Sequence, residues 1–102
     1  MKEYIAIGSS PAAEDCVQIS DPNYNQKSRI ELKAFIEAIR KKLGQEPIGA
    51  HLAIKANPHD FGTYHEIVCY YDNTNELATE YAFKCESESP EIWDEVGMSK
   101  PI

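Results

Sequence analysis

Apolar residues recur every three or four positions in one stretch of this chain, which is the spacing of one face of an α-helix. They are Leu32, Phe35, Ile36, Ile39 and Leu43. The pattern predicts an amphipathic helix that buries this stripe and exposes the charged residues between its members.

The ends of this helix carry their own signals. Ser28 and Glu31 match the S-x-x-E capping box, while Asp21-Pro22 offers an earlier start with aspartate as the cap. Arg40-Lys41-Lys42 fall in the last turn, where cations favour the helix dipole, and Gly44 suits the left-handed residue after the helix. We expect a helix from about 22–28 to 43.

Strand-like patterns lie on both sides of the helix. Residues 3–7 form a short β-rich run that ends at Gly8-Ser9-Ser10-Pro11. Residues 48–57 alternate, with one apolar face made of Ile48, Ala50, Leu52, Ile54 and Ala56. Residues 64–72 are β-rich and apolar on both faces. The turn residues of 58–63 separate the last two runs and predict an antiparallel hairpin with a long loop. Residues 11–21 match neither a helix nor a strand clearly.

The pattern near the C-terminus is open to two interpretations. Residues 75–86 can form a helix, or a strand from Thr79 in which Thr79, Tyr81, Phe83 and Cys85 alternate with polar neighbours. We favour the strand because it buries Phe83. Pro90 then opens a short helix over 90–96, which Trp93 anchors to the rest of the domain and Gly97 ends.

These elements predict one compact α+β domain over residues 1–102. We expect a mainly antiparallel sheet of three or four strands, with the long helix on one face and a short C-terminal helix. The helix stripe and the apolar Ile48–Ile54 face are the expected core partners. The large aromatic side chains are expected mainly in this core, because a small domain must bury most of them.

Composition limits the class of protein. Apolar residues make up 42%, which is normal for a globular domain. No apolar run approaches the about 20 residues that cross a bilayer, and the N-terminal residues do not resemble a secretion signal. Cys16, Cys69 and Cys85 form no CxxC pair, so we expect reduced thiols in a cytoplasmic protein rather than disulfides.

Charge is unevenly distributed along the chain. The net charge is −7, yet residues 27–42 hold six basic and two acidic residues, whereas residues 72–95 hold eight acidic residues and one lysine. The overall acidity argues against general affinity for nucleic acid. A basic helix face with Arg29, Lys33, Arg40 and Lys41 is still a candidate anion or nucleic-acid site, although a well-capped helix explains the same residues.

The predicted hairpin supplies a second candidate. If Ala56 pairs with Tyr64, one sheet face carries His51, Lys55, His65 and Cys69. Imidazole and thiol groups together could ligate zinc or form a Cys–His nucleophile. A shift of one residue in the pairing would place these groups on opposite faces, and the alternative is an ordinary solvated face.

The loop of the hairpin is a third candidate. It brings an imidazole, a carboxylate, a hydroxyl and a phenol together through His59, Asp60, Phe61, Thr63 and Tyr64. Loops held by a rigid hairpin commonly carry function, although simple turn chemistry also accounts for this composition.

Three segments, HDFGTYHEIVCYYD, EYAFKCE and PEIWDE, resemble a family of small uncharacterised bacterial proteins that occur on chromosomes and on mobile elements. The resemblance spans about Glu14 to Glu95. It implies no catalytic residues, and its mobile-element setting suggests an acidic protein that binds a host protein, for example by mimicking nucleic acid.

We therefore expect a non-enzymatic protein-interaction module with no cofactor and no membrane association. It would use the 58–65 loop or the acidic C-terminal third, with an exposed patch around Phe61, Tyr64 or Trp93. Two alternatives stay open, namely a metal or Cys/His enzyme site on the 50–72 hairpin and anion binding by the 27–42 helix.

Overall fold

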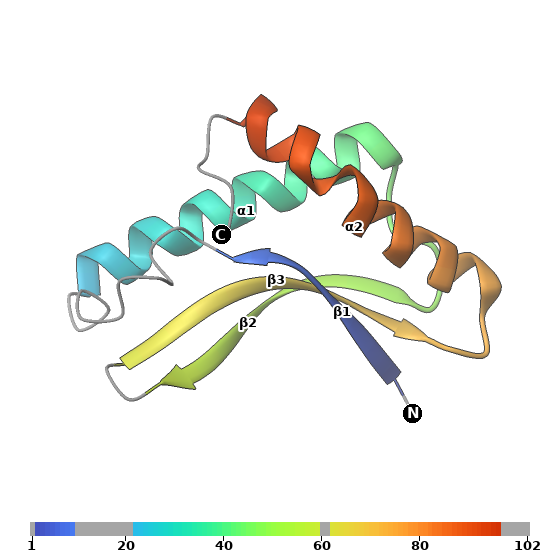
Figure 1. Cartoon of the computed structure of the whole chain (residues 1–102), viewed down its shortest axis with the longest axis horizontal. Helices are drawn as coiled ribbons and strands as arrows, with labels where there is room; N and C mark the ends of the chain where they lie inside the picture. The colour runs from blue at the N-terminus through green and yellow to red at the C-terminus, as the bar shows by residue number, and fades with distance from the viewer. Residues whose placement is uncertain (1, 10–21, 60–61, 97–102) are drawn as a thin grey trace.

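The computed structural model describes residues 2–9, 22–59 and 62–96, with the backbone alone at residues 9, 22–31, 58–59 and 62–64. The elements follow the order β1 (Lys2–Ser9), α1 (Pro22–Leu43), β2 (Ala50–His59), β3 (Gly62–Asp72) and α2 (Glu76–Glu95). The three strands form an antiparallel sheet in the order β1-β3-β2, and both helices cover the same face of it (Figure 1). Because β3 lies between β1 and β2, the first four elements form a split β-α-β arrangement.

Helix α1 confirms the prediction from the apolar stripe, and it begins at Pro22, the earlier of the two predicted starts. Leu32, Phe35 and Ile39 are fully buried, and Ile36 is nearly so. Gly44 has φ +91° and its amide donates to the Arg40 carbonyl, which is the predicted left-handed ending.

Strands β2 and β3 form the predicted hairpin, but its ladder is longer and shifted. Pairing continues to His59 opposite Gly62, so strand residues occupy most of the expected long loop. Ala56 pairs with His65 rather than with Tyr64, a shift of one residue from the expected register. Ile48, expected on the core face, precedes β2 and is 92% exposed.

Strand β1 contains one extra residue relative to β3. Ala6 pairs with Val68 and Gly8 pairs with Ile67, so Ile7 forms an irregularity at which its buried side chain joins the core. A Cβ atom on Gly8 would lie 2.7 Å from Cζ2 of Trp93, so only glycine lets the indole approach this strand so closely.

The region after β3 differs from the expectation. The favoured strand at 79–86 and the separate short helix at 90–96 are wrong, because one helix runs from Glu76 to Glu95. Its buried face consists of Ala78, Tyr81, Ala82, Cys85, Ser89, Ile92 and Trp93. Burial of this whole stripe outweighs the exposure of Phe83, which is 54% accessible.

Helix α2 accommodates a proline in its interior. Pro90 has no amide hydrogen to donate to the carbonyl of Glu86. The Ser89 hydroxyl donates to that carbonyl at 2.9 Å instead, so the carbonyl keeps a partner and the helix continues to Glu95.

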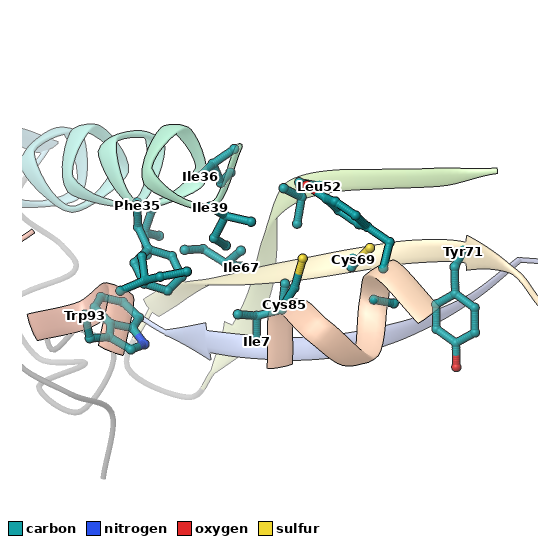
Figure 2. Close-up of a cluster of buried hydrophobic side chains, with 14 of the residues drawn as sticks. Ile7, Phe35, Ile36, Ile39, Leu52, Ile67, Cys69, Tyr71, Cys85 and Trp93 are labelled. Carbon is teal, nitrogen blue, oxygen red and sulfur yellow. The ribbon is translucent and has the colours of Figure 1, made fainter. Parts of the chain in front are cut away.

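The core lies between the sheet and the two helices. Helix α1 packs on β2 and β3, while α2 packs on β1 and β3, and the two helices meet over the middle strand. Figure 2 shows Phe35 from α1 beside Trp93 from α2, with ring centroids 4.1 Å apart in a stacked arrangement. Tyr71, Tyr81 and Trp93 are core residues, as expected for most of the large aromatics.

Candidate functional site

The shift in hairpin register separates the four residues that we expected on one sheet face. His51 and Lys55 pair with Tyr70 and Glu66 on the helix-free face, whereas Cys69 lies on the covered face. His65 precedes Cys69 by four residues in β3, so strand alternation places it on the same, covered face. The proposed polar face is therefore wrong, because a change of one residue in pairing reverses the face of every side chain.

The two cysteines in the described residues lie inside the core. Cys69 and Cys85 are fully buried free thiols (Figure 2), and Cys16 lies outside the described residues. Burial raises the pKa of Cys69 to about 11 and that of Cys85 to about 12. Such thiols stay protonated at neutral pH, so they are poor nucleophiles and poor metal ligands.

Across the described ranges, no group of three or more histidine, cysteine, aspartate or glutamate side chains has a geometry that could hold a metal ion. Every buried side-chain nitrogen or oxygen in that part of the chain has a hydrogen-bond partner. The core therefore presents no unpaired polar group to a ligand. In the same residues, no helix combines the length and the apolar character needed to cross a membrane.

The expected interaction loop falls largely outside what is described. Asp60 and Phe61 lie outside the described residues, and His59, Thr63 and Tyr64 are described by backbone alone. Their backbones belong to the ends of β2 and β3. The proposed role of this loop stays a prediction.

One residue of the predicted basic face of α1, Arg40, binds carboxylates of the protein itself. Arg40 binds Glu46 through two nitrogens, at 2.6 and 3.0 Å, and binds Glu37 at 2.7 Å. These carboxylates raise the pKa of Arg40, while Arg40 lowers that of Glu46. Lys33 and Lys41 are exposed, and the Arg29 side chain lies outside the described part.

A groove of about 540 Å³ between α1 and β2 is lined by Lys33 and Arg40, but also by Glu37. An anion there would compete with the carboxylates that already bind Arg40. Among the proposed basic residues whose side chains are described, Lys33 is the exposed cation that lines this groove.

The acidic C-terminal third consists mainly of helix α2. Helix α2 contains seven carboxylates and one lysine, so it carries −6 of the net charge of −7. On its flank facing α1, Lys42 forms ion pairs with Glu88, Glu91 and Glu95. The Glu91 carboxylate raises the pKa of Lys42, and the lysine in turn lowers the pKa of Glu91.

The other flank of α2 carries a groove with a volume of about 1230 Å³. Its lining follows the spacing of one helical face, through Glu76, Glu80, Phe83, Glu86 and Pro90. Phe83 is 54% exposed, and its ring lies 6.5 Å from that of buried Tyr71. An apolar ring is thus presented among carboxylates on a fixed backbone.

Two structural features determine the position of this groove. The buried stripe of α2 sets which flank turns outward, and the Asn75 side chain caps the helix by accepting from the amides of Leu77 and Ala78. Sequence reasoning missed the groove because it assigned Phe83 to the core. The spacing of Glu76, Glu80 and Glu86 was the signal in the sequence. These residues share one face only if the segment is a helix, whereas a strand was predicted there.

Trp93, expected as part of an exposed patch, is only 2% exposed and belongs to the core. Leu77 on α2 and Ile48 in the loop before β2 are exposed large hydrophobic residues, at 66% and 92%. No protein-family model, no curated protein and no solved structure matches this chain.

Proposed function

We propose that this protein is a non-enzymatic interaction module that binds a basic segment of a partner protein along the outer groove of α2. The observation that carries this proposal is Phe83, a half-exposed aromatic ring in a groove that three carboxylates and one lysine also line. Aromatic side chains are frequent anchors of protein interfaces, and charged residues around them improve specificity and the rate of association.

Charge complementarity favours a basic partner. Glu76, Glu80 and Glu86 line the groove, opposed there by Lys84 alone, whereas the carboxylates bound to Lys42 lie on the other flank. A partner segment with lysine or arginine on both sides of an apolar residue would match the pattern. Nucleic-acid-binding proteins present such basic surfaces, which agrees with the idea of an acidic chain that mimics a nucleic acid.

The fixed helix lowers the cost of binding. The groove belongs to one capped helix whose opposite face is buried against the sheet and α1. The backbone that carries the carboxylates and Phe83 therefore needs little reordering when a partner binds.

The test begins with capture of a partner on the purified chain and its identification by mass spectrometry, followed by titration calorimetry with that partner. We expect Phe83→Ser to weaken binding at least about tenfold, because an interface anchor is lost. Glu80→Gln should weaken binding less and reduce its dependence on salt.

Leu77→Ser is the matched control, since Leu77 is an exposed hydrophobic residue of the same helix that does not line the groove. Glu91→Gln is the corresponding charge control on the Lys42 flank. Equal loss of affinity for Phe83→Ser and Leu77→Ser, or no loss for either, would contradict the proposed site.

A further inference from the structure

The face of the sheet that no helix covers carries a row of planar side chains. Both helices lie on one side of the sheet, and no other element of the described residues covers the opposite side (Figure 1). Tyr4 on β1 pairs with Tyr70 on β3, and Tyr70 pairs with His51 on β2. Three rings therefore lie at the same level on three adjacent strands, on the same face.

These rings are accessible and close to one another. Tyr4 is 48% exposed, His51 is exposed and Tyr70 is partly exposed. The ring centroids of Tyr4 and Tyr70 are 5.8 Å apart, with their planes tilted by 56°.

The next level on this face is made of small apolar residues. Ala6, Val68 and Ala53 pair across the same three strands, so the aromatic row borders a shallow apolar strip. Val68 is fully buried, although it belongs to the helix-free face and not to the core cluster.

Lys55 explains that burial. It pairs with Glu66 on β3, yet its Nζ atom lies 4.0 Å from the ring centroid of Tyr4 on the far strand. Its aliphatic stem must therefore cross β3 over the apolar strip, as long charged side chains often do. The ammonium rests on the tyrosine ring in a cation–π contact, which is weak at an exposed site.

We propose that this face binds single-stranded nucleic acid, with bases stacked on Tyr4 and Tyr70 and a phosphate bound by Lys55. Stacking of bases on aromatic side chains, combined with cations for the backbone, is the general chemistry of single-strand recognition. When a base takes its place on Tyr4, the Lys55 ammonium is released from the ring and reaches the phosphate. A duplex would not fit this chemistry, because its base faces are already stacked.

The distribution of charge permits this partner despite the net charge of −7. Most of the acidic charge is on α2, on the opposite side of the sheet (Figure 1). The helix-free face itself is balanced, since Lys2 and Lys55 lie opposite Asp72 and Glu66. Long-range attraction is therefore small, and affinity must come mainly from stacking.

A second copy of the chain fits this face less well. Packing two such faces together would bury Lys55, Glu66 and His51 from both copies, and burying charged groups is costly without matched partners. Glu66 accepts a hydrogen bond from Asn57 at 2.9 Å, whereas the Lys55 ammonium contacts the Tyr4 ring.

Fluorescence anisotropy with labelled oligo-dT and oligo-U of about ten nucleotides tests the proposal at about 50 mM salt. We expect saturable binding of single strands and at least about tenfold weaker binding of a duplex of the same length. The salt slope should be shallow, near −0.7 to −1.4, because only about one or two phosphates are bound.

Substitutions can separate the contribution of base stacking to binding from that of the Lys55 charge. Tyr70→Ser and Tyr4→Ser should each weaken binding about fivefold or more, while Tyr4→Phe should retain it because the ring is kept. Lys55→Gln should lower the salt slope by about 0.7, and Lys41→Gln, which removes an exposed lysine from α1, should leave the slope unchanged.

Circular dichroism confirms that each variant is folded before binding is compared. Absence of saturable binding, equal binding of duplex and single strand, or unchanged affinity in both tyrosine-to-serine variants would overturn the proposal. Concentration-dependent self-association that Tyr70→Ser abolishes would identify the face as a dimer interface instead. Phe83→Ser leaves this face intact, so failure here is independent of the proposed groove on α2.

Discussion

The contact between Gly8 and Trp93 joins the first strand to the last helix at a separation that no other residue permits. The indole packs directly on the backbone of β1, and a Cβ atom at position 8 would lie 2.7 and 2.9 Å from two of its ring atoms. The same indole stacks on Phe35, so one glycine sets how α1, α2 and β1 meet. Gly44 is different, because its φ of +91° requires glycine while its surroundings are open.

Gly8→Ala should therefore destabilise the protein by about 1–3 kcal/mol, because the added methyl group must displace a buried indole. Urea denaturation measures the loss. Trp93 is the only tryptophan, so its fluorescence should also report the displacement in the folded protein.

Gly44→Ala is the control. It should cost about 1 kcal/mol through backbone strain alone and leave the Trp93 emission unchanged. A Gly8→Ala protein with unchanged stability and emission would show that the indole does not depend on this contact.

The start of helix α2 shows how a local cap and a long-range contact act through one side chain. The Asn75 oxygen accepts from the amides of Leu77 and Ala78, and its Nδ2 donates to the Ile48 carbonyl at 2.8 Å. The first role starts the helix. The second fixes that start against the loop before β2, so the helix emerges with its buried stripe facing the sheet.

Asn75→Ala should cost about 1–2 kcal/mol in the free energy of unfolding, because both the cap and the contact with Ile48 are lost. Asn75→Asp should cost less, since aspartate keeps the cap and loses only the donor to Ile48. Urea unfolding of the two variants in parallel measures the difference, and equal losses would contradict the separation of the two roles.

The molecule as a whole segregates its charge. Helix α2 is strongly acidic, and Lys42 of α1 forms ion pairs with its carboxylates. Arg40, in the last turn of α1, binds Glu46 in the segment that follows the helix. The Glu46 side chain is 7% exposed, so this pair is shielded from solvent better than the Lys42 pairs. Arg40 keeps the pKa of Glu46 below its ordinary value.

The pH dependence of folding follows from that shift. A carboxyl with a lower pKa in the folded state stabilises the fold above its unfolded pKa, and this stabilisation is lost as the pH falls through the folded value. We expect the free energy of unfolding to decrease below about pH 4.5. Glu91 and Asp72, whose pKa values are also lowered, act in the same direction.

Glu46→Gln should lower stability by about 1–2 kcal/mol at pH 7, because Arg40 loses a charged acceptor, and should flatten the acid limb of the stability profile. Urea denaturation from pH 3 to 7 measures both effects, with Glu80→Gln as an exposed control. An acid limb as steep as that of the parent would show that other carboxylates dominate it.

Features that depend on neighbours in the chain were predictable from residue pattern. The stripe from Leu32 to Leu43, the basic last turn and Gly44 specify α1 because helical periodicity and capping act within a few residues. The alternation in 50–56 and the β-rich run in 64–72 likewise predicted two paired strands. These elements, with β1, were enough for the α+β class and an antiparallel sheet.

Features that depend on contacts between distant residues could not be predicted from the residue pattern. Residues 76–86 fit both a helical stripe and a strand alternation, and the choice falls to burial of the stripe against the sheet and α1, which no short window contains. The hairpin register depends on how far the ladder extends toward residues 60–61, and a shift of one residue moved His51 and Lys55 away from Cys69. Both candidate surfaces, the groove beside Phe83 and the aromatic row on the open sheet, exist only because packing between remote segments determines which side chains remain outside.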